Sequence, residues 1–481
     1  MLHNKDINKI SELKNGFTPR WLEPDFLLGS LKCFSFSSLC RSFSSIKQSG
    51  YSFEAIFSIL MSLPFLGLPS VNSIYKSPYL NIIEARKDVF YRLKNKSSID
   101  WRAILWVFVK KFISLHKQEE PVGSPRCLIV DDSLLTKTGK AIERVSRVYD
   151  HVSQRYVLGF KLLLLSYWDG TSNIAVDFSL HREKGRNKEK HYGFKKKELK
   201  KQYKKKRDKG CAASNRVKEC DQSKIDNGIK MVKRAIAKGL KVDYLLMDSW
   251  FTCWAFVDVI IKSKKQAMHL IGMYKTAKTK FGFQGKQLTY KQILNELGKA
   301  KRCRKLGLHY KQATVIWNDV EVKLFFSRQS SKSKWKVFIT TNTSLTFIKM
   351  IEIYQIRWTI EVLFKEAKQL LNLGKCQSND FDAQIAETTV TLIQHLILTL
   401  KYRYEKYESK GELFNQISNQ AVEYRLNERL WGLFRQLIKV ICQLFDGVDE
   451  EDIINKLIND EKAAKLIDTW VIPLKNDEMA A

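Results

Sequence analysis

The chain has 481 residues, of which 44% are hydrophobic, so it is long enough for several structural units and a sizeable core. It carries 83 lysines and arginines against 50 aspartates and glutamates, which gives a formal net charge of +33. An excess this large favours a polyanionic partner (DNA, RNA or an anionic membrane) over a merely basic protein, because the repulsion between positive charges is hard to tolerate without counter-charge.

The composition also argues against two classes of protein. The most apolar stretch, residues 55–68, is 14 residues long and contains a proline and a glycine, whereas a membrane-spanning helix needs about 20 apolar residues. The N-terminus has no apolar core of the secretory type, so we expect a cytoplasmic protein with no membrane partner. The nine cysteines include no C-x-x-C pair, which indicates reduced thiols and neither a disulfide framework nor a zinc site.

Residues 1–120 have the pattern of a basic, helical segment. Apolar residues recur at helical spacing in residues 53–63 and 101–115, with lysine and arginine between them. We expect a compact helical domain that binds DNA, because helices carrying basic residues commonly dock on it. The alternative is a helical bundle whose charged face is only solvated.

The pattern changes to strands at about residue 126. Residues 126–130 form a short apolar run that ends in two aspartates, residues 156–168 have the pattern of a buried strand, and residues 173–180 alternate like its partner. An Asp-Gly turn lies between the last two, so we expect a hairpin. The lysine-rich residues 181–209 follow, and such a run indicates a flexible loop or frayed helix that could also lie along a phosphate backbone.

The second half of this region alternates helices and strands. The expected elements, in chain order, are a helix at 226–240, a strand at 242–247, a helix at 249–261, a strand at 267–273, short strands within 275–345, a long helix at 347–373 and further helices within 383–470. This order predicts an α/β core with a mixed sheet, interrupted by a β-rich insertion.

Acidic residues lie at the ends of two expected strands and in the long expected helix. Asp131 and Asp132 close the first strand, Asp248 closes the strand at 242–247, and Glu361 lies in the long helix. If the two strands are neighbours, their ends bring carboxylates together, and carboxylates suit Mg²⁺ or Mn²⁺. Two such ions support phosphoryl transfer. The alternative is that each aspartate only begins a turn or caps a helix, as Asp248 could for the segment after it.

The long helix contains a more specific pattern. Tyr354, Arg357, Glu361 and Lys368 are separated by three, four and seven residues, which places them on one face of a helix. Such a face suits a metal ion beside a phosphate, with Glu361 on the metal and Arg357 and Lys368 on phosphate oxygens. A solvated face with an Arg357–Glu361 ion pair explains the spacing equally well.

Three motifs in order resemble those of the IS4-family DDE transposases. The pattern Y-x2-R-x3-E-x6-K matches that family's signature at all four positions, V-D-D-S at 130–133 resembles its first-aspartate segment, and L-M-D-S-W-F at 246–251 resembles its second. Ser133 stands where that family usually has threonine. The resemblance covers roughly residues 125–375.

The resemblance implies a ribonuclease-H-like mixed sheet core with a β-rich insertion between Asp248 and Glu361, flanked by helical N- and C-terminal regions. It implies a DNA transposase that binds terminal inverted repeats, cleaves DNA at the element ends and joins the 3′ ends to target DNA. Its cofactor is then Mg²⁺, with Mn²⁺ as a substitute, and its partner is double-stranded DNA, bound as a dimer. The expected domains are 1–120 for DNA binding, 121–275 with 346–380 for the catalytic core, 276–345 for the insertion, and 381–481 for a helical C-terminal region.

The resemblance also implies the roles of the site residues. Asp248 and Glu361 become metal ligands, and Tyr354, Arg357 and Lys368 contact DNA near the cleaved end. The first aspartate is Asp131 or Asp132, whose side chains point to opposite faces of a strand; we prefer Asp132, which directly precedes the hydroxyl residue.

Other functions stay open at this point. One is a stand-alone ribonuclease-H-like nuclease, another is a DNA-binding protein derived from a transposase whose site has decayed, and a third is a basic protein that binds RNA or a membrane. No phosphate-binding loop of the ATPase type is present, since no glycine lies at the required spacing before a Gly-Lys pair.

Overall fold

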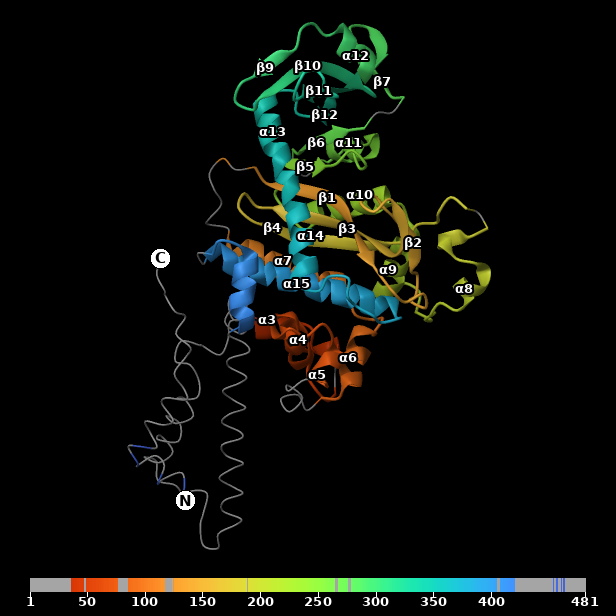
Figure 1. The fold of residues 1–481 in the computed structure, drawn as a ribbon, viewed down its shortest axis with the longest axis vertical. Coiled ribbons are helices and arrows are strands. Elements are labelled where there is room, and N and C mark those ends of the chain that lie inside the picture. Colours follow the sequence, from red (N-terminus) through yellow and green to blue (C-terminus); the bar gives the residue numbers. More distant parts are fainter. Residues whose placement is uncertain are drawn as a thin grey trace. The chain divides into compact units, whose positions relative to one another are not determined.

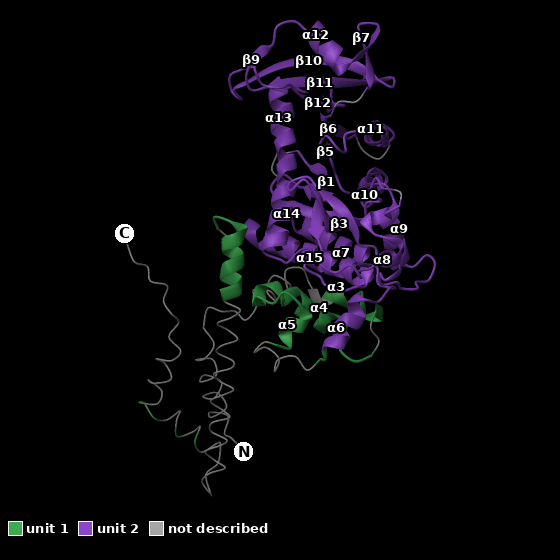
Figure 2. Cartoon of the chain, turned by 45° about the vertical axis from the view of Figure 1, so that its right-hand side comes forward, with its two compact units in different colours: residues 1–86, 407–481 green, residues 87–406 purple. Residues whose placement is uncertain are grey.

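In the computed structural model, the structure describes residues 36–46, 49–76, 85–116, 123, 125–187, 189–263, 267–275, 278–404 and 407–419, and four single positions between 453 and 462. The chain divides into two compact units, one of residues 87–406 and one of residues 1–86 with 407–481 (Figure 2). The expected helices beyond residue 419 lie almost wholly outside the described residues.

The unit of residues 1–86 and 407–481 is helical where it is described. Its helices near the N-terminus are α3 (Phe36–Arg41), η1 (Ser44–Ile46), α4 (Phe53–Ser62), η2 (Pro64–Leu66) and α5 (Val71–Ile74). Ser52 begins α4, since its side chain accepts a hydrogen bond from the backbone of Ala55. The buried side chains of α4 include Phe53, Phe57 and Met61, so the apolar spacing read from the sequence forms a core.

The described residues contain no single helix that is long and apolar enough to cross a membrane. Phe53–Ser62 and Pro64–Ile74, bent by 47° at their junction, reach that length and composition only as a pair.

The unit of residues 87–406 is built on one mixed β-sheet (Figure 1). Its central strands are β1 (Cys127–Thr136), β2 (Ser146–Asp150), β3 (Arg155–Trp168), β4 (Asn173–His181), β5 (Tyr244–Met247) and β6 (His269–Tyr274). Strand β3 pairs antiparallel with both β1 and β4, while β1 and β5, and β5 and β6, are parallel. The order β4-β3-β1-β5-β6 with these directions is that of a ribonuclease-H-like core, so the expected fold class and the β3–β4 hairpin are confirmed.

The expected β-rich insertion extends this same sheet. Its elements are β7 (Lys280–Phe283), β8 (Lys286–Thr289), α12 (Tyr290–Glu296), β9 (Lys301–Cys303), β10 (Leu308–Trp317), β11 (Val320–Arg328) and β12 (Lys336–Thr340). Strand β12 pairs antiparallel with β6, so hydrogen bonds run without a break from the core into the insertion. The hairpin β10–β11 turns at Asn318 and Asp319, with φ of 46° and 64°, the left-handed conformation that a two-residue turn requires.

The other helices of this unit lie on or around the sheet (Figure 1). They are α6 (Lys87–Lys94), α7 (Trp101–Leu115), η4 (His191–Gly193), α8 (Lys196–Lys200), α9 (Ala212–Asp221), α10 (Lys224–Ala237), α11 (Trp254–Ile261), α13 (Phe347–Gln355), η5 (Ile356–Trp358), α14 (Thr359–Gln369) and α15 (Phe381–Tyr404). Helix α15 is buried on every side from Phe381 to Ala386 and from Thr388 to Leu400, as expected of a central core helix. It packs against α7 and β4.

Two helical expectations differ from the structure. The helix expected at 249–261 begins only at Trp254, because Asp248 holds a turn in front of it. The helix expected at 347–373 is divided by η5 into α13 and α14.

The lysine-rich segment at 181–209 is anchored at its C-terminal end. Arg207 is 5% exposed and donates to Glu143 at 2.6 Å and to Asp382 at 2.9 Å. Lys205 donates to Asp380 and Asp382, both at 2.9 Å. Charge-assisted bonds of this kind fix the path of the backbone, so this end of the segment is not the flexible loop that its composition indicates.

A buried ion cluster joins the helices to β4. Asp177 is fully buried and accepts hydrogen bonds from Arg102 of α7 at 2.9 Å and from Arg234 of α10 at 2.8 Å. Arg102 also donates to Glu219 of α9. Burial acts to raise the pKa of Asp177, but the surrounding arginines outweigh it and hold that pKa below its ordinary value. Asp177 therefore fixes α7 and α10 to β4, and Glu219 joins α9 to the same cluster through Arg102.

Replacing Asp177 with asparagine should lower the free energy of unfolding by about 3–5 kcal/mol, because it leaves buried guanidinium groups without their counter-charge. Urea denaturation measures this effect. The matched control is Asp258→Asn, which breaks the exposed Asp258–Lys262 pair of α11 and should change stability by less than about 0.5 kcal/mol. Equal effects of the two variants would contradict a structural role for the cluster.

Candidate active site

The register of two parallel strands brings the first and second aspartate segments together. Val130 of β1 lies opposite Met247 of β5, so Asp131 and Asp248 follow at the same level. Asp248 Oδ1 accepts hydrogen bonds from the backbone N–H groups of Trp250 at 2.9 Å and Phe251 at 3.1 Å, a turn typical of aspartate. This turn fixes the carboxylate beside β1 and does not cap α11.

Arg357 connects the first strand to the Glu361 helix. Its Nη1 donates to Asp131 Oδ2 at 3.0 Å, and its Nη2 donates to Glu361 Oε1 at 2.6 Å. The turn η5 carries Arg357, and the following helix α14 carries Glu361. The carboxylates of Asp131 and Glu361 therefore face the same guanidinium, although 230 residues (361 − 131) separate them.

Helix α14 covers one face of β1. Lys368 Nζ donates to Ser133 Oγ at 2.7 Å, and Ser133 shares a strand face with Asp131 because side chains two residues apart point the same way. Both contacts from the Y-x2-R-x3-E-x6-K segment thus reach the Asp131 face of the strand.

Asp132 lies on the opposite face of β1, under α10. Its Oδ2 accepts a hydrogen bond from Lys224 at the start of α10. Val130 shares this face, and α10 packs closely there: a Cβ at Gly228 would lie 3.8 Å from Val130 and 2.9 Å from Phe256. Lys224 Nζ also lies 3.9 Å from the ring centroid of Trp250. Asp132 is therefore separated from Glu361 by the strand itself.

The surroundings of Asp131 disfavour the ionised form of its carboxyl group. Burial, followed by repulsion from Asp248, raises its pKa to about 7, although Arg357 and a backbone N–H act in the opposite direction. Burial likewise raises the pKa of Tyr354 to about 12, and the Tyr354 ring packs edge-on against Phe338 with 5.0 Å between centroids. Two carboxylates held together without full compensation are typical of a site for a cation.

The donor set at this site fits a divalent metal ion by its chemistry. Asp131, Asp248 and Glu361 supply carboxylate oxygens, the ligands that Mg²⁺ and Mn²⁺ prefer. In the part of the chain that the structure describes, no three acidic, histidine or cysteine side chains are close enough to hold a metal ion as they stand. Arg357 bridges Asp131 and Glu361 here, and the Glu361 side chain is 37% exposed, so it is free to turn from this partner.

A family model described as DDE superfamily endonuclease matches residues 78–262. The matched span contains Asp131, Asp132 and Asp248, while Glu361 lies beyond it. The match supports a DDE transposase-like family and does not specify a subgroup. A search of the curated proteins finds no match.

The structure brings most of the expected site residues together. Arg357, Glu361 and Lys368 all point to β1 or to one another, and Asp248 lies beside Asp131. Tyr354 is on the same segment but is packed against the insertion strand β12. Asp132, which we preferred as the first aspartate of the site, accepts a hydrogen bond from Lys224 of α10 instead.

Sequence reasoning missed two lysines near this site. Lys224 begins a helix behind a polar stretch, which gives no signal. Lys161 does give one, since it is the only charged residue within the apolar run Tyr156–Trp168. A lone ammonium in a buried strand is unusual enough to mark a candidate site.

Asp131→Asn should stabilise the metal-free protein in a pH-dependent way. The raised pKa means that the folded chain holds this proton more tightly than the unfolded chain, so ionisation between about pH 4 and 7 lowers stability. Asparagine cannot ionise, so the variant should gain up to about 4 kcal/mol at about pH 8 and less than about 1 kcal/mol at about pH 4.

Urea denaturation in the presence of a chelator measures this difference. Asp132→Asn is the matched control, because it removes the neighbouring carboxylate and its bond to Lys224 and should give no gain at either pH. The same loss of stability for Asp131→Asn at both pH values would refute the electrostatic assignment.

Proposed function

We propose that the chain is a DNA transposase of the IS4 type, which cleaves DNA at the ends of a mobile element and joins the 3′ ends to target DNA. The observation that carries this proposal is the bridging of Asp131 and Glu361 by Arg357, with Asp248 next to Asp131. The match of residues 78–262 to the DDE superfamily endonuclease model adds support.

Asp131 takes the place of Asp132 as the first metal ligand in this proposal. The side chains of neighbouring residues on a strand point to opposite faces, and only the Asp131 face carries Arg357 and Lys368. Asp132 is paired with Lys224 instead. The proposed ligands are therefore Asp131, Asp248 and Glu361.

When bound, Mg²⁺ or Mn²⁺ supplies charge stabilisation and lowers the pKa of a coordinated water or 3′-hydroxyl. The chain itself positions the DNA. Arg357, whose planar guanidinium suits phosphate oxygens, bonds to the carboxylates of Asp131 and Glu361, and Lys368 bonds to Ser133, two strand positions further along β1. Tyr354 packs on Phe338 and so restricts the motion of this segment. In this proposal it contacts DNA near the cleaved end.

The partner in this proposal is double-stranded DNA at terminal inverted repeats, followed by target DNA, and the DNA-bound form is a dimer. The net charge of +33 supports binding of a polyanion. The helical region of residues 1–120 is the proposed DNA-binding domain.

Substituting each proposed ligand should separate cleavage from binding. Asp131→Asn, Asp248→Asn and Glu361→Gln should each lower the rate of Mg²⁺-dependent nicking by about a thousandfold, which corresponds to about 4 kcal/mol of transition-state stabilisation, and should spare DNA binding. The substrate is a plasmid that carries the DNA flanking this gene, nicking is followed on gels, and binding by mobility shift.

Asp132→Asn is the internal control and should nick at a rate within about tenfold of the unaltered chain. Full nicking by Glu361→Gln would defeat the assignment of the site. Equal inactivation of Asp132→Asn and Asp131→Asn would defeat the choice between the two aspartates.

A second assay separates a transposase from a nuclease of the same fold. Pre-cut DNA ends with free 3′-hydroxyl groups should be joined to a target plasmid by the unaltered chain. Nicking without joining would indicate a stand-alone nuclease. The absence of both nicking and joining would indicate a DNA-binding protein whose site has decayed.

A further inference from the structure

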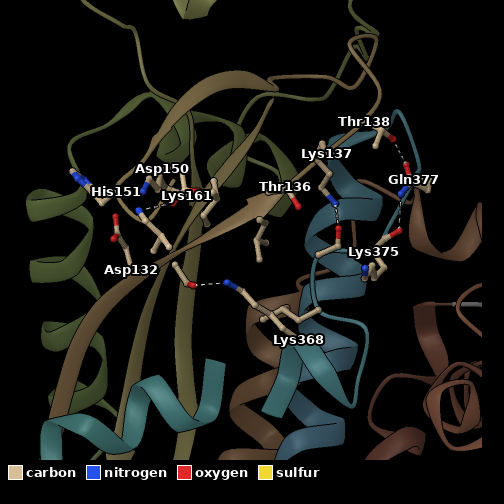
Figure 3. Close-up of a pocket in the computed structure, with 16 residues that line it drawn as sticks. Asp132, Thr136, Lys137, Thr138, Asp150, His151, Lys161, Lys368, Lys375 and Gln377 are labelled. Atoms are coloured by element: carbon tan, nitrogen blue, oxygen red, sulfur yellow. Dashed lines mark hydrogen bonds between the residues drawn. The ribbon is translucent and has the colours of Figure 1, made fainter. Parts of the chain in front are cut away.

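A cavity of about 640 Å³ lies along β1 from Asp132 to Thr136, where the strand continues past Asp131. Its lining includes Lys161 of β3, Lys368 of α14, and Lys375 and Gln377 in the segment after α14. Figure 3 shows Lys161 on one side of this space together with Asp150 and His151, and Lys368 entering from α14. Positive groups from three separate parts of the fold thus face one hollow.

In the described residues, the Lys161 side chain forms no hydrogen bond or ion pair that would stabilise the fold. It lies within the apolar strand β3, and only 6% of its surface is exposed. No acidic side chain in the described residues forms an ion pair with it. Asp150 interacts with it through its charge, but no carboxylate in this part of the chain is close enough to form an ion pair. Burying an ammonium group without such a partner is unfavourable, so the position favours an anion in the cavity.

The two carboxylates that line the cavity are already engaged. Asp132 accepts a hydrogen bond from Lys224, and Asp150 accepts from the hydroxyl of Ser153 at 2.6 Å and the backbone of Val152 at 3.0 Å. Lys137 is also engaged, since it donates to the carbonyl oxygens of Gly374 and Cys376. The cavity therefore keeps an excess of positive charge from Lys161, Lys368 and Lys375.

Lys368 and Lys161 act on each other across this space. Burial, then the nearby charge of Lys161, lowers the pKa of Lys368. Two ammonium groups that repel each other in a half-enclosed cavity are arranged for a shared anionic ligand.

We propose that this cavity binds a backbone phosphate of a DNA strand, adjacent to the phosphate that the carboxylate site acts on, and that Lys161 is its inner anchor. The inference rests on the proposed function, since it takes DNA as the ligand. Ser133, on the Asp131 face, and Leu134, which is paired with Lys161 on the Asp132 face, both line the cavity. A DNA strand that follows β1 from Asp131, with a rise of about 7 Å to Ser133, therefore passes Lys368 first and then Lys161. The outer contact comes from the exposed Lys375.

The test measures DNA binding and stability in the same variants. Lys161→Met keeps the length of the side chain and removes its charge, so it should reduce the slope of log Kd against log salt concentration by about one unit and weaken binding several-fold. Its melting temperature should stay the same or rise, because the buried charge is gone. Fluorescence anisotropy with a duplex from the DNA flanking this gene, titrated over a series of KCl concentrations, gives the slope.

Lys233→Gln is the matched control, since it removes one exposed charge from α10 outside the cavity, and it should leave the slope unchanged. Lys161→Arg should retain the slope. A Lys161→Met variant with a higher melting temperature and an unchanged slope would overturn the proposal, because the lysine would then be only a tolerated buried charge.

Two further arms keep the result decisive. Should Lys161→Met fail to fold, Lys375→Gln at the rim must show the same reduction in slope, and an unchanged slope there would overturn the proposal. Inorganic phosphate alone, at constant ionic strength, should not raise the melting temperature of the unaltered chain; a rise that Lys161→Met lacks would assign the cavity to a small phosphate ligand instead. Nicking is not measured, so a failure of the proposed catalysis does not affect these readings.

Discussion

The guanidinium of Arg357 is the contact on which the geometry of this site depends. It bonds at once to Asp131 on the central strand and to Glu361 on the helix that covers it, and with Lys368 on Ser133 it fixes how α14 lies on β1. Side chains alternate between the two faces of β1, so Asp131 lies on the face that α14 covers and Asp132 lies on the face that α10 covers. A single strand thus separates Asp131, the proposed metal ligand, from Asp132, which binds a helix.

The same arrangement explains why the site is electrostatically strained. Asp131 is buried next to Asp248, and its pKa is raised to about 7. The rest of the core tolerates buried charge differently: Asp177 is surrounded by arginines that hold its pKa low. Within one sheet, a fully compensated carboxylate stabilises the fold, and an undercompensated one lies at the proposed metal site.

The sequence predicted the parts of this structure that depend on local pattern. The alternation in β4, the apolar run of β3 and the turn between them specify a hairpin, and the spacing from Arg357 to Lys368 specifies one helical face. What it did not predict depends on contacts between distant segments. The face of β1 that α14 covers decides between Asp131 and Asp132, and no local pattern contains that information. The break at η5 is equally invisible, because Ile356, Arg357 and Trp358 are ordinary helix residues. Lys161 stands out in the sequence as the only charged residue of the apolar run Tyr156–Trp168. Its proposed role in binding phosphate could be inferred only from the cavity that it lines.

The joining of β6 to β12 has a consequence for any attempt to shorten this protein. Residues 276–345 look like a removable insertion, yet β12 lies within them and covers the edge of β6 along Ile271–Tyr274. Deleting them would leave an apolar strand with unpaired N–H and C=O groups at the rim of the sheet, the kind of edge through which proteins stick to one another. The trimmed chain would therefore be prone to aggregate even with every proposed catalytic side chain in place, because the inserted strands cover the edge of the core sheet as well as extending it.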